Sequence, residues 1–521
     1  MPDQPPEPGA WDWDLPPGAH TDAAADSPAP RFRRTVLYTV AGTALPGLGL
    51  IMARRRVVGG VVLGVFAAAL LGLGAYALLD LQGLAGRFVD PTFLYRLSAG
   101  LIVVALVWVG VVVATHLSLR GRPTRRQRAV GGLLVGLLAF AVAAPMAVAA
   151  RYSYDSASAV QGVFKSQDDS KSATRPTLGG PTQQDPWADK PRLNILLLGG
   201  DADAGREGTR TDTVILASVD THTGDTTLFS LPRNTARMPF PKNSPLRRYY
   251  PHGFTAGDGA DAEFFLNAMY GNVPKKVPGD LLGETDNLGA DVLKLSVGAA
   301  LGLDVDYYML INLQGFSKMI NALGGIRLNV NSYIPIGGNT DLGIPPKEFL
   351  KPGPNQKLDG RSALWYARGR FGSNDYARMD RQRCVINAII KQANPRNVLS
   401  RYEDITKAGK QIVRTDMPQE VLPLMVDLSL RVKNGNVRSI VFRHNENGFL
   451  SYDPDYPRMR QRVKVAIGEA KTTPAASASP KASGKSTAPR NSPKKKTESE
   501  DVDDSCAFDP AMAATATPYR G

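Results

Sequence analysis

Cysteine is scarce in this chain of 521 residues: Cys384 and Cys506 are its only two. Domains built on a disulfide framework carry several cysteines, and structural zinc sites need Cys or His ligands paired at short spacing. Cys384 falls within a predicted helix, whereas Cys506 falls within a polar C-terminal tail. We therefore expect neither a disulfide framework nor a zinc site.

Charged residues are missing from three long apolar stretches near the N-terminus. Residues 57–79, 97–117 and 129–150 contain no Asp, Glu, Lys or Arg. Each stretch is close to the ~20 residues that cross a bilayer as a helix. The apolar region begins too late, and is too often repeated, for a cleaved signal peptide. We predict transmembrane helices here. A fourth stretch, 35–53, is interrupted by a Pro-Gly pair, so it either spans the bilayer or folds back as a re-entrant hairpin.

Clusters of arginine predict the topology of this membrane region, residues 31–150. Arg54–Arg56 separate the first two apolar stretches, and a second cluster at 120–128 separates the last two. Loops rich in Lys and Arg stay in the cytoplasm. The loop at 80–96 has mixed charge and belongs outside. The last helix therefore runs outward, and everything after Arg151 is expected to be extracytoplasmic.

The net charge of +14 invites a nucleic-acid hypothesis, but the distribution of the charge opposes it. Part of the charge flanks the membrane segments, and part lies in the tail at Lys494–Lys496. A domain outside the membrane has no chromosome to bind. We therefore expect no nucleic-acid partner.

Low content of apolar residues marks both ends of the chain as disordered. Residues 1–30 are rich in Pro, Ala and Asp, and residues 468–521 are rich in Ala, Ser, Pro, Thr and Lys. Such compositions bury too little apolar surface to fold. Residues 151–190 are expected to be a polar linker with a short helical stem. This leaves 191–467 as the folded domain.

Short apolar runs alternate with helical patterns through that domain. The run that starts at Leu193 is stopped by Gly199 and Gly200, as expected of a buried strand. The alternation indicates an α/β domain built in layers. The further predicted strands are 214–219, 226–231, 307–312 and 326–330, and the predicted helices are 262–270, 290–301, 314–323 and 378–391.

Polar residues follow or open three of these strands. Asp201, Asp212 and Arg233 would come to one edge of the sheet, where α/β proteins bind ligands. Either aspartate alone could also be a turn or helix cap. The two glycines before Asp201 lack the spacing of a dinucleotide-binding fingerprint.

A run rich in arginine and free of lysine lies between Trp365 and Arg383. Arginine presents a planar fork of donors that fits phosphate oxygens bidentately. On an extended segment the first two arginines would leave the same side, and at a helix start the next two would share a face with Gln382. We therefore predict a phosphate-binding cradle, although a solvated arginine-rich surface is the alternative. The arginines are Arg368, Arg370, Arg378, Arg381 and Arg383, accompanied by Asp375 and Asp380.

The chain from 191 to 467 resembles the LytR-CpsA-Psr (LCP) family of cell-wall ligases, through several short blocks in matching order. The resemblance implies a mixed central β-sheet flanked by helices, placed outside the membrane and preceded by transmembrane helices. The blocks are Asn194-Ile-Leu-Leu-Leu-Gly, Arg210-Thr-Asp-Thr, Leu231-Pro-Arg, Leu266-Asn-Ala, Asp306-Tyr-Tyr, Leu323-Gly-Gly-Ile, Leu358-Asp-Gly, Tyr366-Ala-Arg-Gly-Arg and Asp380-Arg-Gln.

The resemblance implies a transfer reaction in cell-wall assembly. The donor would be an anionic glycopolymer on a polyprenyl pyrophosphate in the membrane lipid, and the acceptor a peptidoglycan sugar hydroxyl. The product would be joined by a phosphodiester. Two alternatives are a hydrolase that only cleaves the pyrophosphate and a non-catalytic, wall-binding or regulatory membrane protein.

Breaking a pyrophosphate requires positive charge where negative charge develops. Asp201 and Asp212 would hold Mg²⁺, a hard ion that takes carboxylates together with substrate oxygens. A carboxylate near Arg210 or Arg370, either Asp212 or Asp375, would take the proton of the acceptor. Asn234 departs from the family, where many relatives carry aspartate. The residues assigned to the pyrophosphate are Arg233, Arg368, Arg370, Arg378, Arg381 and Gln382.

Overall fold

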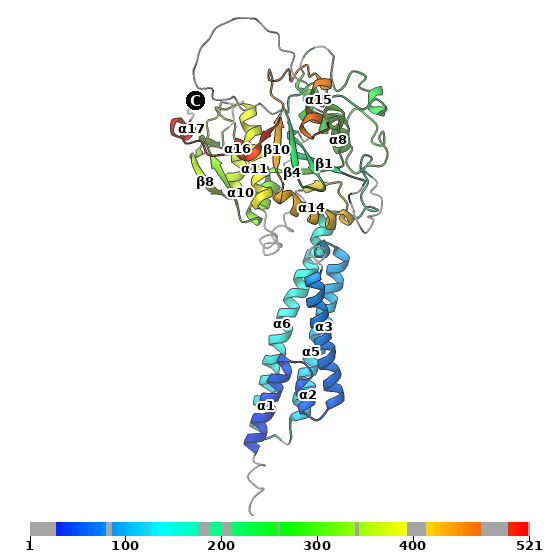
Figure 1. Cartoon of the computed structure of the whole chain (residues 1–521), viewed down its shortest axis with the longest axis vertical. Coiled ribbons are helices and arrows are strands. Elements are labelled where there is room, and N and C mark those ends of the chain that lie inside the picture. The colour runs from blue at the N-terminus through cyan, green and yellow to red at the C-terminus, as the bar shows by residue number, and fades with distance from the viewer. Residues whose placement is uncertain are drawn as a thin grey trace, which may run out of the picture. The chain divides into compact units, whose positions relative to one another are not determined.

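The computed structural model consists of two compact units (Figure 1). The helical unit comprises Met1–Leu81 and Tyr95–Ser153, and the α/β unit comprises Gln82–Leu94 and Tyr154–Gly521. The residues that the structure describes are 28–79, 86–121, 123–176, 187, 189–200, 210–257, 259, 261–338, 343–392, 413–469 and 499–518.

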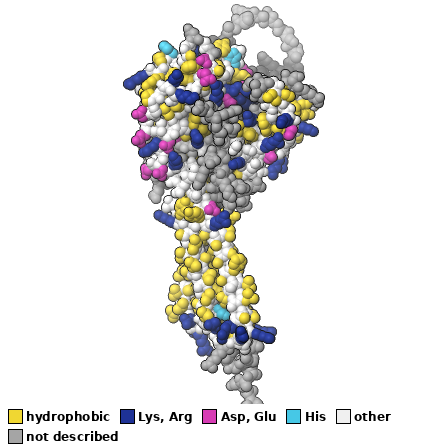
Figure 2. All heavy atoms as spheres, turned by 180° about the vertical axis from the view of Figure 1, so that it is seen from behind, with side chains coloured by type: hydrophobic (Ala, Val, Ile, Leu, Met, Phe, Trp, Pro, Cys, Tyr) yellow, Lys and Arg dark blue, Asp and Glu magenta, His cyan; other side chains and the backbone are white. Residues whose placement is uncertain are grey.

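Three helices among the described residues are long and apolar enough to cross a membrane: Arg56–Tyr76 within α3, then α5 and α6. Figure 2 shows hydrophobic side chains along the surface of these helices, with Lys and Arg gathered at one end. The helices that contribute to this unit are α1 (Pro28–Ala44), α2 (Leu48–Met52), α3 (Arg56–Leu79), α5 (Pro91–Leu119) and α6 (Arg125–Val163).

The ambiguous apolar stretch at 35–53 folds back on itself. The chain turns between α1 and α2 at Gly47, whose φ of 96° is left-handed. A Cβ added to Gly49 would lie 2.8 Å from the carbonyl oxygen of Tyr38. In a continuous helix these two residues would be about 16 Å apart. The stretch therefore has the form of a re-entrant hairpin.

The α/β unit is built on one seven-stranded sheet in the order β11-β10-β3-β2-β1-β4-β9. β2 runs antiparallel to both β1 and β3, whereas β1 pairs with β4, and β3 with β10, in parallel. The predicted mixed α/β fold is confirmed. The strands are β1 (Arg192–Gly200), β2 (Thr211–Asp220), β3 (Thr226–Leu231), β4 (Tyr307–Asn312), β9 (Val413–Thr415), β10 (Val437–Val441) and β11 (Glu500–Asp501).

Alternation along the central strands buries both faces of the sheet. Leu196 and Leu198 of β1 belong to the main core with α7, α8 and α15, whereas Leu193 and Leu197 pack into smaller clusters on the opposite face.

Two small sheets pair β5 with β8 and β6 with β7. The remaining elements are η1 (Pro245–Arg248), η2 (Ala262–Phe264), α7 (Leu266–Asn272), α8 (Leu288–Leu301), α9 (Leu313–Ala322), β5 (Ile326–Val330), β6 (Ile334–Ile336), β7 (Glu348–Leu350), β8 (Gly353–Leu358), α10 (Gly360–Arg368), α11 (Asp375–Gln392), η3 (Gln419–Val421), α14 (Leu422–Asn434), α15 (Tyr456–Ala466), α16 (Val502–Ser505) and α17 (Pro510–Thr515).

The expectation that the C-terminal tail is disordered is wrong for residues 499–518. Residues 499–518 are folded onto the α/β unit: β11 pairs antiparallel with β10, and Val502 is fully buried. Cys506 forms a disulfide with Cys384 of α11, across a sequence separation of 122 residues. The average composition of the tail concealed this docking, because one apolar side chain, a short strand and one cysteine are enough to anchor the segment.

The segment that follows α6 is more ordered than the expected polar linker. α6 continues to Val163, and residues 172–174 are held by the buried carboxylate of Asp291 in α8. That carboxylate accepts from Ser172 Oγ at 3.0 Å, from the backbone nitrogen of Ala173 at 3.1 Å and from Thr174 Oγ1 at 2.5 Å. Thr285 Oγ1 donates to the same group at 2.5 Å. Asp291 is thus a main anchor of the entry to the α/β unit, beside Asp416, which also accepts from Ser172 Oγ at 3.0 Å.

Replacing this acceptor should loosen the entry segment. We expect Asp291→Ala to lower the free energy of unfolding by about 2–3 kcal/mol, because several half-buried donors lose their partner. Protease sites near residues 164–176 should be cut faster. Asp453→Ala is the control, since its exposed ion pair with Arg237 does not involve the entry segment and should contribute less than about 1 kcal/mol. Equal stability and equal cleavage of the two variants would refute the assignment.

Candidate active site

The edge of the sheet where β2 begins and β3 ends gathers opposite charges. The antiparallel register places Val214 beside Leu231, so the start of β2 and the residues after β3 lie together. Arg233 Nη1 donates to Asp212 Oδ1 at 3.0 Å. Two of the three charged residues predicted at this edge are therefore in contact. The third, Asp201, lies outside the described residues.

Helix α11 adds a second acid and a second arginine at the same place. Arg233 Nε lies 3.6 Å from Asp375 Oδ1, and Arg378 Nη2 donates to Asp375 Oδ2 at 3.1 Å. The same nitrogen of Arg378 also donates to the backbone oxygen of Asp212 at 3.1 Å. The result is an alternating cluster of Asp212, Arg233, Asp375 and Arg378, which we call the charge cluster.

The cluster keeps its carboxylate at Asp212 ionised. Burial opposes ionisation of this side chain, but the charge and hydrogen bond of Arg233, the charge of Arg378 and the amide of Asn267 together hold its pKa below the ordinary value. Arg378 is only 4% exposed, and burial lowers its pKa against the opposing effect of Asp375 and Asp212. Buried charges of this kind are tolerated where they are paired.

Two further polar residues complete the edge without having been assigned a role from sequence. Asn267 Nδ2 donates to Asp212 Oδ1 at 3.4 Å, and its backbone nitrogen donates to the carbonyl oxygen of Arg233 at 3.0 Å. Thr213 Oγ1 accepts from Gln382 Nε2 at 2.8 Å, so Gln382 connects α11 to β2. The Leu266-Asn-Ala block was the only sequence signal for Asn267.

Arg381 differs from its predicted role in binding pyrophosphate. Its guanidinium is buried and donates to the carbonyl oxygen of Tyr366 at 2.7 Å and to that of Gly369. Burial lowers its pKa to about 10. Two of its nitrogens thus donate to the turn between α10 and α11, and these contacts position that turn.

The other predicted arginines are placed as follows. Arg368 is the exposed last residue of α10, not part of an extended segment, and its guanidinium lies 5.0 Å from the centre of the Trp365 ring. Arg370 is half-buried in the turn that Arg381 supports. Arg210 forms an ion pair with Glu263, whose carboxylate also accepts from Asn272. Among the described residues, Arg210 therefore pairs with Glu263 and not with Asp212.

Arginines of the run make contacts on two sides of α11. Arg383, which belongs to the arginine run but is not among the residues assigned to the pyrophosphate, donates to Asp380 Oδ1 at 2.9 Å and lies 3.1 Å from Glu500 Oε2 of β11. Arg443 also donates to Asp380 Oδ1, at 2.6 Å. These contacts tie α11 to β10 and β11. Helical spacing predicted the face of Arg378 and Gln382, while Arg383 supports the opposite side.

A divalent cation fits this edge only together with an anionic substrate. The hydrogen bonds that described residues make to the Asp212 carboxylate both go to Oδ1, and Asp375 Oδ1 is a buried oxygen with ion-pair contacts but no hydrogen-bond partner. Two oxygens are thus suited to a hard cation. The neighbouring Arg233 and Arg378 repel it unless phosphate oxygens complete its ligands. No group of three or more His, Cys, Asp or Glu that could hold a metal occurs among the described residues.

The lowered pKa of Asp212 predicts a pH-dependent contribution to stability. A carboxylate whose folded pKa is depressed contributes stability above its unfolded pKa, and this is lost as pH falls through the folded pKa. We expect the wild type to exceed Asp212→Asn in free energy of unfolding at neutral pH, with the difference shrinking below about pH 4. Urea denaturation across a pH series measures it. A difference that grows on acidification would contradict the pairing.

Comparisons with known proteins identify a family for this chain. The model of the LytR_cpsA_psr family matches residues 151–464. The chain is 28% identical to a polyisoprenyl-teichoic acid–peptidoglycan teichoic acid transferase TagU of Oceanobacillus iheyensis over 278 residues, which are 51% of this chain and 72% of that protein. It is 27% identical to the TagU of Enterococcus faecalis, over 53% of this chain and 78% of that protein.

A crystal structure of B. subtilis TagV aligns with 54% of this chain, and the alignment covers 99% of the TagV chain in that structure. The sequence identity is 22% and the TM-score is 0.35. That similarity is too low to support an argument about the site. The family match, in contrast, covers more than half of the chain and includes the whole charge cluster. This protein therefore belongs to the LytR-CpsA-Psr family.

Proposed function

We propose that this protein is a phosphotransferase that attaches an anionic glycopolymer, carried on a polyprenyl pyrophosphate, to a sugar hydroxyl of peptidoglycan. The observation that carries the proposal is the charge cluster, which sits at the sheet edge inside the matched family region. Two arginines held by two carboxylates provide fixed positive charge and a proton acceptor at one place. The names of the relatives, teichoic acid transferases acting on peptidoglycan, support the substrate class.

Binding of the pyrophosphate would use Arg233, which follows β3, together with the arginines on both sides of the α10–α11 turn. Arg233 and Arg378 are held in place by carboxylates, so their donors need little reorganisation when negative charge develops on the phosphoryl oxygens. Arg368 and Arg370 lie at the more exposed side of the turn and would hold the donor as it enters. Arg381 keeps both in position through the turn carbonyls.

The transfer step forms one phosphorus–oxygen bond and breaks another. The acceptor hydroxyl oxygen attacks the phosphorus next to the glycan, and the bond to polyprenyl phosphate breaks, so that polyprenyl phosphate leaves. The hydroxyl proton passes to a carboxylate. We assign this role to Asp375, because its buried Oδ1 accepts no hydrogen bond while Arg378 and Arg233 hold it at 3.0 and 3.6 Å, and because Asp212 is assigned to Mg²⁺.

Mg²⁺ is proposed as a cofactor bound with the substrate. Asp212 would hold it together with pyrophosphate oxygens, and Asp201 is the second predicted ligand. Bound there, it would neutralise charge on the pyrophosphate.

The proposed location is a multi-pass membrane protein with the α/β unit outside the cytoplasm. The arginine clusters at 54–56 and 120–128 support this topology, because basic loops remain cytoplasmic. The disulfide between Cys384 and Cys506 gives independent support, since such bonds persist in oxidising compartments and are rare in the cytosol.

The test uses the full-length protein in detergent with a polyprenyl-pyrophosphate glycan, Mg²⁺ and peptidoglycan oligomers. We expect mass spectrometry to detect glycan joined to the peptidoglycan sugar through a phosphodiester, with the product lost in Arg370→Ala. Released polyprenyl phosphate without a joined product, unchanged by added oligomers, would instead identify a hydrolase. An intact donor under all conditions would refute catalysis.

A further inference from the structure

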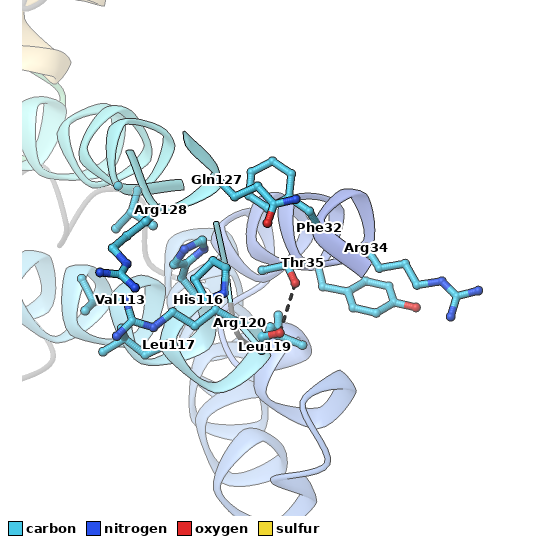
Figure 3. A pocket seen from close by; sticks show the side chains of 15 residues that line it. Phe32, Arg34, Thr35, Val113, His116, Leu117, Leu119, Arg120, Gln127 and Arg128 are labelled. Carbon is cyan, nitrogen blue, oxygen red and sulfur yellow. Dashed lines mark hydrogen bonds between the residues drawn. The ribbon is translucent and has the colours of Figure 1, made fainter. Parts of the chain in front are cut away.

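A cavity of about 870 Å³, open to the surface, lies between α1, α5 and the start of α6 in the helical unit. Its wall is apolar along the helices, where Val113, Leu117 and Val135 contribute side chains, and basic near the helix ends. Thr35 Oγ1 donates to the carbonyl oxygen of Leu119 at 3.1 Å and closes one side, as Figure 3 shows. An apolar wall with a basic end suits an amphiphilic ligand, whose apolar part can lie along the helices.

Three arginines line this cavity: Arg34, Arg120 and Arg128. Figure 3 shows Arg120 and Arg128 extending toward the same side of the cavity, whereas Arg34 points away from it. Arg120 directly follows α5, and Arg128 lies in the first turn of α6. Arg120 and Arg128 are both exposed, so this end of the cavity is positive and accessible to an anion from outside the chain.

No carboxylate from the described part of this unit can supply that anion. Residues 28–79 and 95–153 contain no Asp or Glu. In the α/β unit, by contrast, Arg233 and Arg378 lie beside acidic side chains. The positive end of the cavity therefore has no acidic side chain of the described helices beside it.

The start of α6 adds to the positive potential. Thr124 and Gln127 cap each other, with the backbone nitrogen of Gln127 donating to Thr124 Oγ1 at 3.3 Å and that of Thr124 to Gln127 Oε1 at 3.1 Å. This fixes the N-terminus of a 39-residue helix at the rim of the cavity. A helix N-terminus attracts negative charge. The buried His116 lines the same cavity, with Nδ1 3.3 Å from Thr39 Oγ1.

We propose that this cavity binds one anionic phospholipid, with its phosphate between Arg120 and Arg128 and an acyl chain along the apolar wall of α5 and α6. The arginines lie at the ends of membrane-spanning helices, at the level where lipid phosphates lie. Basic pockets between such helices on the cytoplasmic side suit anionic headgroups. The proposal depends on the proposed membrane topology and is separate from the transfer chemistry.

Lipid retained by the full-length protein is the measurement. The protein is extracted from nanodiscs of phosphatidylcholine that contain a minor share of phosphatidylglycerol, and native mass spectrometry counts the bound lipids. We expect one phosphatidylglycerol per chain, and about tenfold weaker retention in Arg120→Gln/Arg128→Gln. The matched control is Arg54→Gln/Arg55→Gln, which removes two arginines that do not line the cavity.

A pair of glycine substitutions tests the cavity without changing its charge. Gly132 lines the cavity, and a Cβ added there meets no atom within 4 Å, so Gly132→Phe should fill the space and displace the lipid. Gly136, one turn further along α6, is equally open but does not line the cavity. Gly136→Phe should retain phosphatidylglycerol like the wild type.

Three results would overturn the proposal. Equal losses in the two arginine double variants would show general attraction to a charged surface. Retained phosphatidylglycerol in Gly132→Phe would place the lipid elsewhere. Displacement of phosphatidylglycerol by millimolar inorganic phosphate or glycerol phosphate would show that the site takes a soluble phosphate instead of a lipid. Transfer activity is measured in parallel, and its presence or absence does not decide the lipid result.

Discussion

Replacing Arg233 by alanine should reduce kcat/KM for glycopolymer transfer about 100- to 1000-fold, the effect of removing one preorganised donor from a developing negative charge. Arg233 is the central member of the charge cluster, since it contacts both Asp212 and Asp375. Its loss leaves two acids beside one remaining arginine and removes a donor to the phosphoryl oxygens. The transfer assay with full-length protein measures the effect.

Two companion variants separate catalysis from folding in this experiment. Arg233→Lys keeps the charge but not the bidentate fork, so we expect an intermediate loss of about tenfold. Arg247→Ala removes an exposed arginine whose recorded hydrogen bond is to the carbonyl oxygen of Pro251, and should transfer at the wild-type rate. Wild-type activity in Arg233→Ala, with an unchanged unfolding midpoint, would remove the charge cluster from the mechanism.

Loss of the disulfide should destabilise the α/β unit by about 2–4 kcal/mol, since the bond closes a long loop and thereby restricts the unfolded chain. The bond connects α11, the helix that carries Asp375 and Arg378, to the segment that contains β11. We expect Cys506→Ser to show a clearly lower midpoint in thermal unfolding than the wild type.

Reductant provides the internal control for the disulfide. It should lower the midpoint of the wild type to that of Cys506→Ser and leave the variant unchanged. Cys384→Ser should match Cys506→Ser, because either change removes the same bond. A wild type insensitive to reductant and equal in stability to both variants would show that the bond contributes nothing.

Local patterns predicted the central part of the fold. Strand β3 agrees with its prediction at 226–231, and β4 agrees at 307–312, because short apolar runs bounded by turn residues are a local signal. The inner strand β10 and the edge strands β9 and β11 were missed. The two edge strands have three and two residues, and only pairing with distant segments defines them.

The sequence predicted which strand ends meet at the candidate site, but not the contacts that each arginine makes there. Strand ends correctly indicated that Asp212 and Arg233 would meet. The sequence could not separate Arg378, which joins the charge cluster, from Arg381, which braces the turn, because both are arginines on one helix. The difference arises from which carbonyls and carboxylates surround each guanidinium after folding. The role of Glu263 as partner of Arg210 was equally non-local.

The docking of β11 against β10 has a consequence for how the protein is made. β10 is synthesised by Val441, but its outer partner is not available until Glu500 and Asp501 have emerged, close to the end of the chain. During synthesis the hydrogen-bonding edge of β10 is exposed, and unpaired edges invite association with other chains. The sheet can be completed only after Asp501 has been synthesised. The disulfide to Cys384 of α11 likewise forms only after Cys506 has been synthesised, so we expect a chain truncated before β11 to be slow to mature and prone to aggregate.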